Sequence, residues 1–310
     1  MSLWETIGKE ISRASAAPFV MSEQQSVGGG CINSAYCIGD GSRRYFVKLN
    51  SAEGLEMFEA EADGLRELAA AQAVKVPVPL VTGIAAGQAF IVMEALELGG
   101  SGSAARLGQE LAALHRTTRA HFGWYRDNTI GSTPQYNSEE ASWVKFWRER
   151  RLLPQLEMAA RRGAGSALQK KGERLLLELP AFFDGYSPTP SLLHGDLWAG
   201  NYAYCRDGTP VMSRDGRYSG SPGGSEPVIF DPAVYYGDRE TDLAMSELFG
   251  GFGRDFYDAY NEAWALDEGY AVRKTLYNLY HILNHFNLFG GGYAGQAETM
   301  IGRLLAEVGG

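Results

Sequence analysis

The chain has 310 residues, of which 45% are hydrophobic and 21% charged, and its formal net charge is −9. This globular composition suits one large domain or two unequal lobes. The negative charge argues against broad binding to nucleic acid or an anionic membrane, and no apolar run approaches the ~20 residues that span a bilayer. The start of the chain lacks a secretory signal pattern, so we expect a cytoplasmic protein.

Residues 1–95 predict strands around one helix, whereas residues 96–310 predict mainly helices. We therefore expect an α+β, two-lobed fold, with a small β-rich N-terminal lobe and a larger helical C-terminal lobe. The boundary falls near Glu94 to Gly100, where an apolar strand over residues 89–93 runs into a glycine-containing segment. The helices expected in the larger lobe cover residues 104–118, 142–158, 166–179, 242–249, 254–265 and 271–288.

Three glycines, Gly28, Gly29 and Gly30, stand between two predicted strands. A tight loop of this kind lets backbone amides approach phosphates without obstruction by side chains. A glycine-rich turn that binds no ligand is the alternative. The residues expected to bind ATP also include Met93, Glu94 and Leu96, which lie at and just after the end of the strand over residues 89–93.

The helix of the first lobe has Asn50 or Ser51 as its expected cap, and Glu61 falls on its apolar face. The apolar residues of that face are Leu55, Phe58, Ala62, Leu65 and Leu68. Because an unpaired buried charge costs several kcal/mol, Glu61 needs a partner. Lys48, in the strand over residues 45–49, is the predicted one. Kinases use such a pair to orient the lysine towards the α and β phosphates, whereas a solvated strand lysine is the alternative.

Asp196 and Asn201 stand five positions apart in the string that begins at His194. This spacing matches the kinase pattern H-R-D-x-x-x-x-N, with Gly195 in place of the arginine. A carboxylate there can orient the attacking hydroxyl and accept its proton, while the amide oxygen binds Mg²⁺. We expect His194 to brace the loop. A polar turn without catalytic function is the alternative for the whole string.

Asp231 ends an apolar strand and precedes a proline, so its carboxylate is a predicted hard oxygen ligand for Mg²⁺. Asp238 and Asp242 follow closely, and we expect a helix cap and a buried loop brace from them in preference to metal ligands. The order of these features along the chain is typical of kinases: the glycine loop, the strand lysine, the helix glutamate, the Asp-x4-Asn string and the aspartate at the end of a strand. The polar, glycine-rich stretch 206–227 predicts an extended hairpin or mobile loop.

Three cysteines argue against a disulfide framework and suit a reducing compartment. Cys31 lies within the glycine loop, whose backbone donors could favour a thiolate, and this motivates a redox hypothesis. Cys37 would be about 20 Å away along an extended strand, so a disulfide would more readily join two chains or involve Cys205. A small residue filling a turn is the alternative for Cys31.

Seven strings are distributed along nearly the whole chain: Gly28–Asn33, Phe58–Glu61, Asn128–Asn137, His194–Asn201, Asp231–Glu240, Phe249–Phe252 and Asn284–Gly290. Together they resemble the fructosamine kinase (ketosamine-3-kinase) family. That family is related to aminoglycoside phosphotransferases, so the resemblance implies a protein-kinase-like two-lobed fold. It implies transfer of the γ-phosphate of ATP to the 3-hydroxyl of a fructosamine or ribulosamine, which promotes deglycation.

Carried onto this sequence, the resemblance makes Lys48 and Glu61 the phosphate-orienting pair, Asp196 the base, and Asn201 and Asp231 the Mg²⁺ ligands. Trp198 is a candidate platform for stacking on the sugar, or else it packs the catalytic loop. The expected partner is a small or protein-bound ketosamine, and the expected assembly is a monomer or homodimer. Alternatives are another kinase of the superfamily, acting on an aminoglycoside, choline or homoserine, or a non-catalytic nucleotide-binding module.

Overall fold

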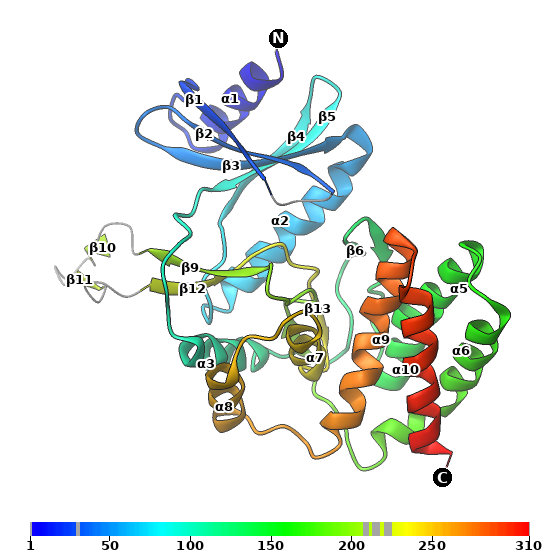
Figure 1. Ribbon diagram of the computed structural model, residues 1–310. Coiled ribbons are helices and arrows are strands. Elements are labelled where there is room, and N and C mark those ends of the chain that lie inside the picture. The colour runs from blue at the N-terminus through cyan, green and yellow to red at the C-terminus, as the bar shows by residue number, and fades with distance from the viewer. Residues whose placement is uncertain (1, 29–31, 207–210, 213–217, 220–224, 310) are drawn as a thin grey trace. The chain divides into compact units, whose positions relative to one another are not determined.

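The computed structural model describes residues 2–28, 32–206, 211–212, 218–219 and 225–309 (Figure 1). The chain forms two compact units. The first contains residues 1–107 and 200–232, and the second contains residues 108–199 and 233–310. The segment 200–232 therefore packs with the N-terminal unit, although a single division at residue 95 would leave it in the C-terminal lobe.

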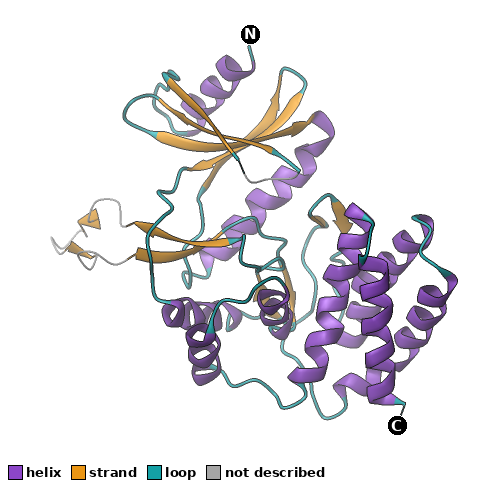
Figure 2. Cartoon of the chain, viewed as in Figure 1, coloured by secondary structure: helices purple, strands orange, loops and turns teal. Residues whose placement is uncertain are grey.

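The first unit is built on a five-stranded antiparallel sheet in the order β1-β2-β3-β5-β4. Figure 2 shows this sheet with its helices in purple. Its elements are α1 (Leu3–Ala14), β1 (Glu23–Val27), β2 (Ser34–Gly39), β3 (Arg44–Ser51), a 3₁₀ turn (Ala52–Gly54), α2 (Leu55–Ala70), β4 (Pro79–Ala85) and β5 (Gln88–Glu94). From the later segment come β9 (Tyr202–Arg206), β10 (Val211–Met212), β11 (Tyr218–Ser219) and β12 (Ser225–Ile229).

Helix α1 was not expected, and it covers one face of the sheet. Its buried Ile7 and Ile11 join a core cluster with Val47 and Leu49 of β3. Side chains alternate along a strand, so Lys48 between them points to the opposite face, where its partner lies in α2. The sequence signal for α1 was available, because Ser2 and Glu5 form a capping box at its start.

The start of α2 differs from the prediction. Neither Asn50 nor Ser51 provides a side-chain cap, because a 3₁₀ turn intervenes and the residue that precedes α2 is Gly54. The predicted apolar face is otherwise confirmed by the burial of Phe58 and Leu65.

The second unit is mainly helical (Figure 2). Its elements are α3 (Ala104–His115, which begins in the first unit), β6 (Asn128–Ile130), β7 (Thr133–Gln135), α4 (Trp143–Phe146), a π-helix (Trp147–Leu152), α5 (Leu153–Arg161), α6 (Ser166–Glu178), a 3₁₀ helix (Leu179–Phe183), β8 (Ser191–Leu193), β13 (Tyr235–Gly237), α7 (Glu240–Leu248), α8 (Arg254–Ala263), α9 (Tyr270–Phe289) and α10 (Tyr293–Val308).

The helix expected over residues 142–158 is confirmed as one helical stretch, in which a π-helical segment joins α4 to α5. Helix α10 was missed because Gly295 and Gly302 lower the helix propensity of its sequence. Packing against α6 and α9 stabilises it instead.

The stretch 206–227 was predicted to be an extended hairpin or a mobile loop. Strands β9 and β12 pair antiparallel at its base, and the short strands β10 and β11 pair further out. A hairpin is therefore the form taken by the part of the stretch that the structure describes.

Candidate active site

A buried lysine lies between two carboxylates in the first unit. Lys48 Nζ in β3 is 2.6 Å from Glu61 Oε1 in α2 and 2.6 Å from Asp231 Oδ1. The side chains of Lys48 and Glu61 are about nine-tenths buried, whereas that of Asp231 is 48% exposed. The predicted pairing of Lys48 with Glu61 is confirmed, and the half-exposed Asp231 leaves the triad accessible to a ligand.

The two carboxylates keep the lysine charged. Burial by itself would lower the pKa of Lys48, but Glu61 and Asp231 outweigh it and hold the pKa above its usual value. Burial raises the pKa of Glu61, while the Lys48 charge opposes the rise. An ammonium fixed in this way can interact with anionic phosphates without first losing the freedom of a long side chain.

The predicted glycine loop joins β1 to β2, which are antiparallel with Val27 opposite Ala35. Ala35 in turn lies opposite Lys48. The loop therefore emerges beside the lysine. Gly28 follows β1 directly, and a Cβ built there would meet open space. Gly29, Gly30 and Cys31 lie outside the described residues.

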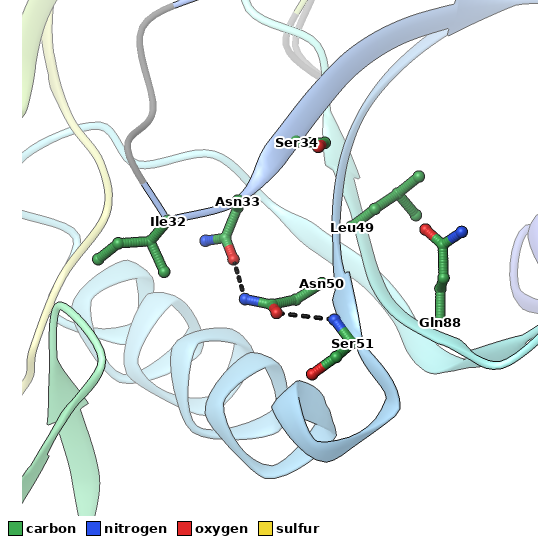
Figure 3. Close-up of a pocket in the computed structure, with 7 residues that line it drawn as sticks. All are labelled: Ile32, Asn33, Ser34, Leu49, Asn50, Ser51 and Gln88. Carbon is green, nitrogen blue, oxygen red and sulfur yellow. Dashed lines mark hydrogen bonds between the residues drawn. The ribbon is translucent and has the colours of Figure 1, made fainter.

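A pocket of about 540 Å³ lies beside the start of β2 and the end of β3, and Figure 3 shows the residues that line it. Its lining residues are Ile32, Asn33, Ser34, Leu49, Asn50, Ser51 and Gln88. The side chains of Asn33 and Asn50 point toward one another, and Asn50 Nδ2 donates to Asn33 Oδ1 at 2.7 Å. Asn50 Oδ1 accepts from the Ser51 amide at 2.7 Å. Asn50 was expected to cap a helix, but it ties the residues after the glycine loop to the end of β3.

The two predicted metal ligands, Asn201 and Asp231, lie at the same end of the β9–β12 hairpin. Asn201 precedes β9, and its carbonyl accepts from Phe230 N at 3.0 Å, which extends the ladder by one step towards Asp231. Asp231 has a φ of 57°, in the left-handed region that few residues other than glycine adopt. Strained backbone of this kind is common at ligand sites.

Oxygen donors of this type fit Mg²⁺, which binds one or two protein groups together with substrate phosphates. Among the described residues, no group of three or more His, Cys, Asp or Glu side chains could hold a metal ion by itself. The side-chain oxygens of Asn201 and Asp231 are of the type that fits Mg²⁺.

In the second unit, the loop after β8 carries Asp196 and is held by one carboxylate. Asp242 in α7 accepts from the backbone amides of His194 at 2.7 Å and Gly195 at 2.8 Å. His115 Nε2 lies 3.2 Å from Asp242, and His115 Nδ1 lies 2.8 Å from the Tyr260 hydroxyl. The expected loop brace at Asp242 is present. The contributions of His115 and Tyr260 were missed, because no local pattern links α3 and α8 to this loop.

Burial alone would raise the pKa of Asp242, but the hydrogen bond and charge of His115 outweigh it and hold the pKa below its usual value. Asp242 is therefore an ionised acceptor for the loop.

His194 braces the same loop, because its carbonyl accepts from Ala233 N at 2.8 Å and its Nδ1 accepts from Asp196 N at 3.3 Å. Asp238 Oδ1 accepts from Glu240 N at 3.0 Å, but the N-cap of α7 is Arg239, so the expected cap at Asp238 is not the one that the helix has.

Gly195 stands where the kinase pattern has arginine, and its backbone explains why. Its φ is 82°, and a Cβ built there would lie 2.0 Å from the Ala233 carbonyl oxygen. No residue with a side chain fits this position without movement of the loop.

A model of the fructosamine kinase family matches residues 3–307. The chain belongs to the fructosamine kinase family. Its relatives include a protein assigned as a ketoamine kinase from Synechocystis sp., 48% identical over 309 residues, which are 97% of each chain. They also include a chloroplastic protein-ribulosamine 3-kinase from Oryza sativa subsp. indica, 42% identical over 280 residues, or 89% of this chain and 77% of the relative.

Solved structures confirm the expected fold class. A protein assigned as a fructosamine-3-kinase from Haemophilus somnus superposes with a TM-score of 0.84, at 28% identity over 98% of each chain. The aminoglycoside phosphotransferase APH(4)-Ia superposes with a TM-score of 0.58, at 14% identity over 99% of this chain and all of that one, which is a likeness of fold alone. The α+β, protein-kinase-like fold expected for this fructosamine kinase family member is therefore confirmed.

The remaining candidate residues are Met93, Glu94 and Leu96 in the first unit and Trp198 in the second. Met93 is buried near the end of β5, and Glu94 N donates to the Val78 carbonyl at 2.9 Å, which anchors the end of the strand. Leu96, which follows it, is half-buried. Trp198 is 38% exposed, and its amide donates to the Asp196 carbonyl at 3.2 Å. The partial exposure of Trp198 leaves part of its ring available for stacking on a ligand, while its other contact is with the ring of Phe249.

Cys205, which the redox hypothesis named as an alternative partner, is 4% exposed, and burial raises the pKa of its thiol. A buried thiol of this kind is a poor nucleophile. Cys37 is half-buried, and both are free thiols. No helix in the described part of the chain is long and apolar enough to cross a membrane.

Proposed function

We propose that this protein transfers the γ-phosphate of ATP to the 3-hydroxyl of a ketosamine, a fructosamine or a ribulosamine. The observation that carries the proposal is Lys48, held 2.6 Å from both Glu61 and Asp231 in a chain of the fructosamine kinase family. This arrangement supports binding of ATP phosphates, since phosphoryl transfer depends mainly on positioning and charge neutralisation.

In the proposed reaction, Lys48 and the glycine loop bind the phosphates of ATP, and Met93, Glu94 and Leu96 bind its base. Asp196 orients the 3-hydroxyl and accepts its proton as the oxygen bonds to the γ-phosphorus and the bond to the β–γ bridging oxygen breaks, so that ADP leaves. Asn201 and Asp231 would hold Mg²⁺, which supplies neutralisation of phosphate charge when bound.

The acceptor is proposed from the names of the relatives, one of which is a protein-ribulosamine 3-kinase. We assign the nucleotide-binding lobe to residues 1–95, with Leu96 directly after it, and the catalytic and acceptor-binding lobe to residues 96–310, which also supplies the proposed Mg²⁺ ligands. The protein is proposed to act in the cytoplasm as a monomer or homodimer. Phosphorylation at the 3-hydroxyl promotes deglycation, because enolisation of the C2 ketone towards C1 makes the phosphate an allylic leaving group.

The test is a screen of purified protein with MgATP and synthetic fructosyl- and ribulosyl-amines, followed by phosphorus NMR and mass spectrometry. We expect a sugar phosphate ester that decays to inorganic phosphate and releases the free amine. Kanamycin, choline and homoserine serve as controls and should not be phosphorylated. A stable ester formed only on one of these three would refute the proposal.

A further inference from the structure

Five aromatic side chains of the second unit form a continuous run, called here the aromatic run: Trp198, Phe249, His285, Phe289 and Tyr293. The ring centroids of Trp198 and Phe249 are 6.3 Å apart, and those of Phe249 and His285 are 4.8 Å apart. His285 then lies 5.6 Å from Phe289 and 5.2 Å from Tyr293. The run connects the Asp196 loop with the C-terminal side of α7 and with α9 and α10, two helices that pack side by side (Figure 1).

The aromatic run faces solvent. Phe289 is 57% exposed and Trp198 is 38% exposed, while the other three rings are half-buried. The unit also has an interior aromatic cluster around Trp143, Trp147 and Tyr277, in which all three side chains are at most 3% exposed. Neighbouring aromatic rings left at a surface typically mark a binding site.

The run starts at the proposed site of reaction. The Trp198 amide donates to the Asp196 carbonyl at 3.2 Å, so Trp198 lies in the same turn as the residue proposed to engage the 3-hydroxyl. In a ketosamine, only C2 and C1 separate the carbon that bears this hydroxyl from the amine nitrogen. Whatever is attached to the nitrogen therefore begins close to Trp198 and can continue along the other rings.

The chemistry of the amine end suits these rings better than the chemistry of the sugar's other end does. The secondary amine of a ketosamine is cationic at neutral pH, and aromatic faces attract cations. On a glycated lysine it is followed by a hydrocarbon stem, which packs on apolar surface. The hydroxyl groups at the far end of the sugar have neither property.

Resting on the proposed function, we propose that Phe249, His285, Phe289 and Tyr293 bind the lysine stem and adjoining peptide of a glycated protein, and so select protein-bound over small ketosamines. His285 adds a polar contact. Its Nδ1 lies 2.8 Å from the His281 carbonyl, which can only accept, so Nδ1 carries the hydrogen. In the neutral ring Nε2 is then an acceptor for a peptide N–H or for the amine.

The test compares two acceptors that share one sugar. One carries fructose on methylamine, and the other carries it on the lysine ε-amine of an acetylated, amidated peptide. The readout is the ratio of kcat/KM for the peptide to kcat/KM for the methylamine derivative. We expect Phe289→Ala to lower this ratio by about tenfold, as loss of one aromatic contact predicts. Phe289→Tyr, which keeps the ring, should stay within about twofold of the wild type.

Leu177→Ala is the matched control, because Leu177 in α6 is an apolar residue of the same unit and is 77% exposed. Its ratio should equal that of the wild type. An unchanged ratio in Phe289→Ala would overturn the inference, and a change of oligomeric state with an unchanged ratio would assign the aromatic run to a contact between copies of the chain. If the wild type phosphorylates neither acceptor, the proposed function itself fails.

Discussion

Replacement of Gly195 by alanine should disable the catalytic loop and leave nucleotide binding intact. The left-handed φ of 82° costs a residue with a Cβ roughly 1–2 kcal/mol. The larger effect is steric, because the new Cβ would lie 2.0 Å from the Ala233 carbonyl oxygen and 2.8 Å from its carbon. Both are backbone atoms, so no side-chain rotation relieves the overlap and the loop itself must move.

That movement acts on Asp196 directly. The Gly195 amide donates to Asp242 at 2.8 Å, and a hydrogen bond to a charged group is worth about 1.5–3 kcal/mol. A displacement of about 1 Å in a catalytic group lowers a rate by about 100-fold. We therefore expect kcat to fall at least about 100-fold. The affinity for ATP should change little, because Lys48 and its partners lie in the other unit.

The assay pairs steady-state kinetics with calorimetric titration of ATP and circular dichroism. Gly163→Ala is the matched control, since Gly163 has a φ of 84° and open space around its built Cβ. It should lose some stability and keep full kcat. A kcat for Gly195→Ala within about threefold of the wild type, or an equal loss in Gly163→Ala, would refute the steric argument.

Three further predictions concern charged groups. Lys48→Ala and Asp231→Ala should each remove most activity and leave the fold intact by circular dichroism. The first removes the cation proposed to meet the ATP phosphates, and the second removes a proposed Mg²⁺ ligand; near-normal kcat/KM in either would contradict the site. Asp196→Asn should lose kcat and retain ATP affinity, and a kcat within about tenfold of the wild type, about 1.4 kcal/mol of barrier, would move the base elsewhere. Burial lowers the pKa of His281 to about 3, whereas histidine in the unfolded chain has a pKa near 6.5. As the pH falls below about 6.5, the unfolded chain therefore binds a proton that the folded protein does not, and the free energy of unfolding decreases. The free energy of unfolding of the wild type, measured with urea, should therefore fall by about 2 kcal/mol between pH 7 and pH 5 because of this residue. An equal fall in His281→Gln would contradict the assignment.

The sequence alone determined the parts of the site that depend on local periodicity. Alternation in β3 and helical spacing in α2 directed Lys48 and Glu61 at one another across thirteen residues, and the 2.6 Å contact bears this out. The five-residue spacing of Asp196 and Asn201 is also a local signal. The same kind of signal was present for α1 in Ser2 and Glu5, whereas the glycines of α10 obscured a helix that packing stabilises.

Only the tertiary structure decided the contacts between residues far apart in the chain. Asp231 meets Lys48 across 183 residues, and His115 reaches Asp242 across 127. Local propensity reports the conformation of a segment and not its neighbour, so neither contact has a sequence signature. Gly195 shows the same limit, since its departure from the kinase pattern follows from the position of the Ala233 carbonyl, which the fold of the second unit places against it.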